Sequence, residues 1–128
     1  MEITVKMNDV LNFKNGVEAF REKKLPLPGA YKLTKINNAL DKDFEFYSTK
    51  FQEIIDKYAK KDEEGNYVYS EGGDQIMIQE DKLTEANDEL EDLFTLDVTV
   101  DNMDLSIENF GDIDCTPEEL EAIMPFIS

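Results

Sequence analysis

The sequence predicts an α+β protein that folds as a single domain over residues 1–128. Apolar residues recur at helical spacing in four segments, and shorter segments between them alternate as strands do. Of the 128 residues, 41% are hydrophobic, which suits one hydrophobic core but not two. We therefore expect a long central helix packed with shorter helices and a small antiparallel sheet or hairpin.

The N-terminal part is predicted to be a short strand followed by a helix. The segment 2–7 alternates, with Ile3, Val5 and Met7 on one side. Asn8 and Asp9 then offer N-caps for a helix. Its apolar face consists of Val10, Phe13, Val17 and Phe20. This helix has to stop at residues 25–29, because that segment contains two prolines.

The strongest helical pattern predicts one long helix over residues 30–61. Its apolar residues step by three or four, and they are Leu33, Ile36, Leu40, Phe44, Tyr47, Phe51, Ile54 and Tyr58. A lone helix cannot bury such a stripe, so we interpret it as a core face or a homodimer interface. We expect five of these residues to be largely buried, in the monomer or in a dimer: Leu40, Phe44, Tyr47, Phe51 and Ile54.

The second half mixes strands and helices. A β-hairpin is predicted from residues 67–69 and 75–79, joined by a turn at 70–74. An acidic helix over residues 80–95 follows, with an apolar face of Leu83, Asn87, Leu90 and Phe94. Alternation predicts a strand at residues 96–100 and a further one at Leu105 and Ile107. A last helix starts with Thr116 as its N-cap and Glu119 at the third position.

Charge divides the chain sharply between residues 61 and 62. Residues 1–61 hold 12 of the 13 basic residues and nine acidic ones, a net charge of +3. Residues 62–128 hold Lys82 and 21 acidic residues, a net charge of −20. Direct binding to nucleic acid through a basic face is therefore not expected, whereas an acidic face suits a basic partner protein.

The composition also excludes common kinds of chemistry. The absence of His excludes Ser-His or Cys-His nucleophiles and His-ligated metals. The single cysteine, Cys115, forms no internal disulfide, which favours a reducing compartment. The N-terminal residues are not those of a signal peptide, and no apolar run approaches the roughly 20 residues of a membrane span. We expect no enzymatic activity, no cofactor and no membrane partner.

Two catalytic or metal-binding alternatives are weak. Asp112 and Asp114 follow Gly111, but the remaining spacing of a calcium loop is missing. Asp74 with the Glu80-Asp81-Lys82 triplet resembles a magnesium-dependent nuclease arrangement, but such triplets arise often by chance.

The acidic half has two interpretations. The simpler one is a surface that only faces water, and the more specific one is mimicry of a polyanion such as DNA. A helix with two acids per turn approaches the linear charge of one DNA strand. The candidate partner-binding residues crowd the acidic helix and the segment after it: Asp81, Glu85, Asp88, Glu89, Glu91, Asp92, Asp97, Asp101 and Asp104.

Three segments carry a resemblance to a known family. They are Tyr31-Lys32-Leu33-Thr34-Lys35-Ile36, residues 55–66, and Thr116-Pro117-Glu118-Glu119-Leu120 leading to Met124-Pro125-Phe126-Ile127. The chain resembles small acidic proteins of unknown function from tailed phages and prophages of Gram-positive hosts. The resemblance implies a phage origin and a setting in the host cytoplasm or the virion, and it transfers no functional residue.

Two functions follow as expectations. The first is a non-enzymatic phage inhibitor of the anti-CRISPR or anti-restriction type, which binds a basic, nucleic-acid-handling host protein through the acidic face. The alternative is a virion structural or assembly protein that self-associates through the long helix.

Overall fold

The computed structural model describes all 128 residues, and its α+β fold confirms the predicted class. The chain divides into two compact units. The terminal unit consists of Met1–Glu45 with Thr95–Ser128, and the central unit is Phe46–Phe94. The charge boundary between residues 61 and 62 falls inside the central unit, so the units are not the two charge halves of the sequence.

The sheet of the terminal unit joins the two ends of the sequence. Strand β1 (Glu2–Lys6) pairs antiparallel with β2 (Asp97–Asp101), with Lys6 opposite Asp97. Three valines are buried on one face, namely Val5, Val98 and Val100, while their neighbours are more exposed. The alternation that predicts both strands therefore reflects one buried face.

Helix α1 (Met7–Arg21) follows β1 without a loop. Its buried residues are Met7, Val10, Phe13, Val17 and Phe20, which includes the whole predicted apolar face. The predicted caps are wrong, because Lys6 is the N-cap and Asn8 lies inside the helix. Asp9 instead lies in the first turn, where its carboxylate accepts a hydrogen bond from the Lys6 N–H at 3.0 Å.

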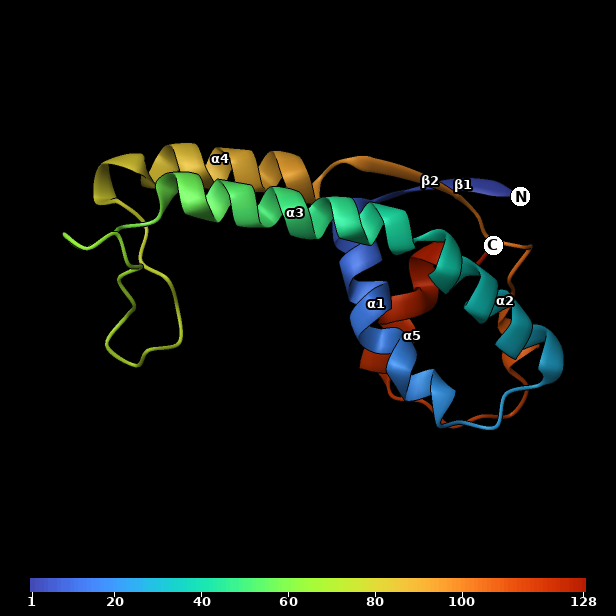
Figure 1. The fold of residues 1–128 in the computed structure, drawn as a ribbon. Coiled ribbons are helices and arrows are strands. Elements are labelled where there is room, and N and C mark those ends of the chain that lie inside the picture. Colours follow the sequence, from blue (N-terminus) through green and yellow to red (C-terminus); the bar gives the residue numbers. More distant parts are fainter. The chain divides into compact units, whose positions relative to one another are not determined.

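Helix α5 (Pro117–Ile123) packs across α1 (Figure 1) and begins as the sequence predicts. The Glu119 N–H donates to the Thr116 hydroxyl at 3.2 Å, and the Thr116 N–H donates to the Glu119 carboxylate at 2.8 Å. Gly16 permits the close approach of the two helices, because a Cβ atom there would lie 2.3 Å from the Cβ of Ala122.

The core of the terminal unit is aromatic and fully enclosed. The rings of Phe13 and Phe126 lie 4.7 Å apart between centroids, and those of Phe20 and Phe110 lie 5.8 Å apart. Phe126 belongs to the last turn, η3 (Met124–Phe126). The apolar side chains with no exposed surface are Val10, Phe13, Ile36, Leu40, Leu105, Ile123 and Phe126.

The prediction of one helix over residues 30–61 is wrong, because two helices occupy this range. Helix α2 (Leu27–Ala39) ends at Leu40, and α3 (Asp41–Tyr58) begins directly after it. The Leu40 N–H bonds to the carbonyls of both Ile36 and Asn37, as in the tightened last turn of a helix. Asparagines are weak helix formers near this end, and Asp41 places a negative charge in the first turn of α3, where it is favourable.

The predicted strand at Leu105 and Ile107 is also wrong. Met103 and Asp104 have φ angles of 57° and 55°, and the Leu105 N–H bonds to the Asn102 carbonyl at 2.9 Å. The chain therefore turns sharply after β2 and continues into a short 3-10 helix, η2 (Ile107–Phe110).

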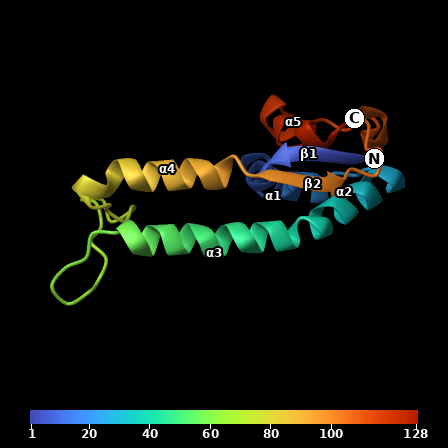
Figure 2. The ribbon, with the colours of Figure 1, turned by 90° about the horizontal axis from the view of Figure 1, so that it is seen from above.

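Two antiparallel helices dominate the central unit. Helix α4 (Leu83–Phe94), preceded by the turn η1 (Glu80–Lys82), runs beside α3 in both views (Figures 1 and 2). The ring of Tyr47 on α3 lies 5.9 Å from the ring of Phe94 on α4 and 5.6 Å from that of Phe51. An aromatic cluster therefore joins the two helices.

Extended segments connect α3 to α4. Ala59 pairs with Ile78, Lys61 with Tyr67, and Tyr69 with Ile76, each as an isolated antiparallel bridge. The predicted hairpin is therefore present as isolated bridges, and residues 59–61, predicted as helix, belong to this extended region.

The apolar stripe of α3 is less buried than predicted. Leu40 is fully buried, but Phe44, Tyr47, Phe51 and Ile54 are only half-buried within this chain. Two helices side by side cover each other on one side only, so the flanks of the stripe stay accessible.

The buried face of α4 differs from the predicted one. Ala86 and Leu93 are buried, whereas Leu83 is 50% exposed and Asn87 is exposed. The sequence pattern gave little weight to the small side chain of Ala86, so the apolar face that it predicts lies at a different angle around the helix.

No helix of the chain has both the length and the apolar character that crossing a bilayer requires.

Candidate interaction surface

Four acidic residues of α4 and its leading turn form an exposed row. Asp81, Glu85, Asp88 and Asp92 are spaced by four, three and four residues, and all four are exposed. At 100° per residue this spacing places Glu85, Asp88 and Asp92 on one side of α4, and with Asp81 of the leading turn they form what we call the acidic stripe. Ala86 and Leu93, the buried residues of α4, lie about 120° around the helix from it.

Three members of the acidic stripe have no partner in the chain. Asp81, Asp88 and Asp92 form no ion pair and no side-chain hydrogen bond. Glu85 lies 3.7 Å from the ammonium group of Lys82, one turn away, and both side chains are about half exposed. Exposed pairs of this kind contribute little to stability. The stripe therefore presents carboxylates that the fold does not use.

Glu89 has a different role from the stripe. Its carboxylate lies 3.3 Å from the Lys57 ammonium group, which links α4 to α3. A hydrogen bond from the Tyr58 hydroxyl, and then the Lys57 charge, lower the pKa of Glu89 below its ordinary value. The Tyr58 ring lies under the same ammonium group, with 5.0 Å between Nζ and the ring centroid. Glu89 therefore stabilises the helix pair.

The last three candidate residues belong to the terminal unit. Asp97 pairs with Lys6 across the sheet. Asp101 accepts hydrogen bonds from the Met1 ammonium group at 2.9 Å and from the Met103 N–H at 2.8 Å, and these two contacts lower its pKa. Asp104 lies 3.5 Å from the same ammonium group. These carboxylates are occupied by cations and N–H groups of the fold itself.

The nine candidate residues divide between the two units. Six lie on α4 and its leading turn in the central unit, and three lie on β2 and the turn after it in the terminal unit. The sequence shows that they are close along the chain, but only the structure reveals which of them have internal partners.

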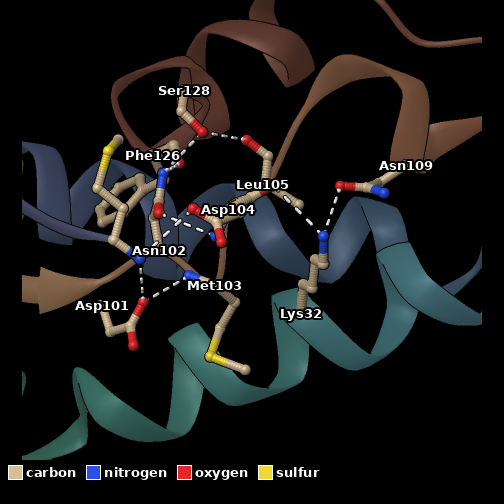
Figure 3. A network of polar contacts seen from close by, with 10 residues as sticks. Lys32, Asp101, Asn102, Met103, Asp104, Leu105, Asn109, Phe126 and Ser128 are labelled. Atoms are coloured by element: carbon tan, nitrogen blue, oxygen red, sulfur yellow. Dashed lines mark hydrogen bonds and ion pairs between the residues drawn. The ribbon is translucent and has the colours of Figure 1, made fainter.

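A buried polar network that the sequence does not indicate lies beside Asp101 and Asp104 (Figure 3). Asn102 has no exposed surface, and its amide donates to the Phe126 carbonyl at 3.0 Å and to the Ser128 hydroxyl at 3.2 Å. Its side-chain oxygen accepts from the Asp104 N–H at 3.0 Å. The network holds the turn after β2 against the C-terminal residues, and it is structural.

The carboxylates do not gather as metal ligands do. No group of three or more Asp, Glu, Cys or His residues in the chain is arranged so that it could hold a metal ion. Lys82, which the nuclease alternative places beside Glu80, forms its ion pair with Glu85. Carboxylates spread along a helix act through their summed field on a partner surface.

Comparisons with family models, with curated proteins and with solved structures find no match to this chain.

Proposed function

We propose that this chain is a non-enzymatic binding protein whose acidic helix α4 occupies the nucleic-acid-binding surface of a basic protein. The partner is a protein that handles DNA or RNA, and occupation of that surface inhibits it. The proposal rests on one observation, the exposed row of carboxylates on α4 and its leading turn, three of which have no partner in the chain.

The charge density of this helix supports the proposal. Residues 81–92 carry six carboxylates, Asp81, Glu85, Asp88, Glu89, Glu91 and Asp92. Twelve helical residues span about 18 Å, so the helix carries about one carboxylate per 3 Å. One strand of B-DNA carries about one phosphate per 3.4 Å of axis. The total charge of the helix therefore approaches that of one DNA strand of equal length, but Glu89 and Glu91 lie off the acidic stripe, whose four carboxylates follow one another at about 5–6 Å.

In the unbound protein, repulsion among the carboxylates of the acidic stripe favours binding to a cationic partner. Like charges at three- and four-residue spacing destabilise a helix by a few tenths of a kcal/mol per pair. Cations of a partner would relieve this repulsion, and no internal ion pair of Asp81, Asp88 or Asp92 has to break first. Attraction of this kind accelerates association and weakens as salt rises.

The resemblance to small phage proteins supplies the biological setting of the proposal. In that setting the partner is a host defence protein, such as a CRISPR effector or a restriction enzyme, and the site of action is the host cytoplasm. The acidic helix takes no cofactor and performs no chemistry in this function.

A virion assembly role is the second candidate, and one observation favours it. Phe46 on α3 is 47% exposed, and Tyr47 and Phe51 of the same helix are half-buried. Apolar surface of this kind suits self-association. Phe46→Asp would then abolish an oligomer seen by analytical ultracentrifugation, and mass spectrometry of purified particles would detect the protein.

The test of the lead function uses a charge-reversal variant of the stripe. Asp81, Asp88 and Asp92 are replaced together by Lys, and both proteins capture partners from host lysate at low and high salt. We expect the wild type to retain a nucleic-acid-binding protein at low salt, to release it at high salt, and to release it to a DNA or RNA oligonucleotide. The variant should retain little of it.

A control variant with the same change in net charge distinguishes binding by the acidic stripe from attraction by the overall negative charge of the protein. Glu108, Asp112 and Glu121 are exposed residues of the terminal unit without ion pairs, and their replacement by Lys changes the net charge equally. Capture by this control should resemble that of the wild type. Equal loss in both variants, or capture that neither salt nor oligonucleotide affects, would contradict the proposal.

A further inference from the structure

A cavity of about 500 Å³ lies in the terminal unit between α1 and α2. Ligand-binding cavities commonly measure about 300–1,000 Å³, so its volume suits a small molecule. It lies among residues of α1, of the connection that follows it, and of α2. The acidic stripe belongs to the other unit and has no part in it.

The inner wall of the cavity is apolar. Val17 and Phe20 of α1 face Leu33 of α2, and each of these side chains is at most 5% exposed. Leu25 and Ala30 complete this wall. The surface would receive a hydrocarbon group of a ligand and remove it from water.

The rim of the cavity is basic in a chain that is otherwise strongly acidic. Arg21, Lys23 and Lys24 line it, and none of the 30 Asp and Glu residues does. Lys24 has no ion-pair or hydrogen-bond partner, whereas Lys23 donates to the Asp114 carbonyl at 2.6 Å and pairs with the Glu119 carboxylate at 3.5 Å. Arg21 pairs with Glu18 one turn away, but both side chains are at least 60% exposed, so the guanidinium group can exchange partners easily.

An amide without a partner lies in the same cavity. Asn37 lines it, and the side-chain oxygen of Asn37 is buried with no hydrogen-bond partner. Buried polar atoms of proteins are nearly always paired, so an unpaired one calls for an explanation. The Asn37 oxygen only accepts hydrogen bonds, so a carboxylate would have to meet the Asn37 NH₂ group instead.

We infer that this cavity binds a small amphipathic carboxylate, such as a medium-chain acyl chain that ends in a carboxyl group. The hydrocarbon part lies against Val17, Phe20 and Leu33, and the carboxylate meets Lys24 and Arg21 at the rim. The inference is independent of the function proposed for α4.

Decanoate is the probe that tests the inference. Backbone amide resonances of ¹⁵N-labelled protein are followed as decanoate is added, well below the concentration at which it forms micelles. We expect saturable shifts of residues that line the cavity, with Ala30, Leu33 and Thr34 among them. Decyltrimethylammonium has the same chain and the opposite charge, and it should cause no saturable shift there.

Two variants locate the site. Lys24→Glu should weaken decanoate binding by about tenfold or more, because it replaces an attractive charge by a repulsive one. Thr34→Phe should abolish binding, since Thr34 is exposed and a larger side chain there fills the cavity without removing a core residue. Lys42→Glu, an equal charge change outside the cavity, should bind as the wild type does.

Three results would overturn the inference. They are the absence of saturable shifts at the cavity, equal binding of the cationic probe, and equal weakening by Lys24→Glu and Lys42→Glu.

Discussion

Gly16 of α1 lies so close to Ala122 of α5 that a Cβ atom at position 16 would stand 2.3 Å from the Cβ of Ala122. Real Cβ atoms do not approach so closely. The glycine that weakens α1 as an isolated helix is therefore what lets α5 pack against it.

Gly16→Ala should destabilise the protein, although Gly→Ala at an open helical position usually stabilises by up to about 1 kcal/mol. The steric overlap should cost about 1–3 kcal/mol, as overpacked core sites do. Urea unfolding measures the change. Adding Ala122→Gly should recover part of the loss, and a double variant no more stable than Gly16→Ala would show that the contact is not the cause.

Asn102→Leu should destabilise by about 2–4 kcal/mol, because it leaves buried backbone groups without partners. The variant removes the donor to the Phe126 carbonyl and the acceptor for the Asp104 N–H. The control is Asn12→Leu, at an exposed site without side-chain hydrogen bonds, and the two variants are compared by thermal unfolding. Equal changes in the two variants would mean that the network contributes no special stability.

Phe13→Ala and Phe51→Ala should differ strongly in their effects. Phe13 has no exposed surface, and its loss should cost about 3–5 kcal/mol, as for other enclosed aromatic residues. Phe51 is half-buried on α3, so its loss should cost about half as much in the monomer. Denaturant unfolding at several protein concentrations checks this. The loss of stability in Phe51→Ala could instead equal that in Phe13→Ala and grow with protein concentration. That result would reveal a dimer that buries the apolar stripe of α3.

Acid should weaken the pairing of α3 and α4 through Glu89. The Tyr58 hydroxyl and the Lys57 ammonium group lower the pKa of Glu89 in the folded state. A lowered pKa stabilises the fold above the unfolded carboxyl value of about 4, and this stability is lost as the pH falls through the folded value.

Glu89→Gln should therefore flatten the fall in melting temperature between about pH 5 and pH 3. Circular dichroism at a series of pH values follows the transition. Asp88→Asn removes a neighbouring carboxylate that has no ion-pair partner, and its profile should stay close to that of the wild type. An unchanged slope in Glu89→Gln would show that this contact does not couple folding to protonation.

Local signals predicted much of the fold correctly. The alternation at residues 2–7 and 96–100 predicted β1 and β2, and the capping pair Thr116 and Glu119 predicted the start of α5. These signals act within a few residues, where backbone conformation is coupled directly to side-chain type. The prediction failed at Leu40, because a stripe with continuous spacing carries no mark of a helix break inside it.

The candidate interaction surface was predictable in composition but not in its details. The density of acids on α4 is a property of the sequence, and so is the three- and four-residue spacing of Asp81, Glu85, Asp88 and Asp92. Whether a carboxylate is free depends on cations that arrive from distant parts of the chain. Lys57 reaches Glu89 in this way, and Lys6 reaches Asp97.

The sequence by itself determined the fold class, the positions of most helices and strands, and the strong negative charge of residues 62–128, because these depend on residue type and short-range periodicity. Only the tertiary structure decided where α2 gives way to α3, which face of α4 is buried, and which carboxylates remain without partners. It also decided that Arg21, Lys23 and Lys24 surround an apolar cavity. These properties depend on contacts between segments far apart in the chain, and neither composition nor local spacing records such contacts.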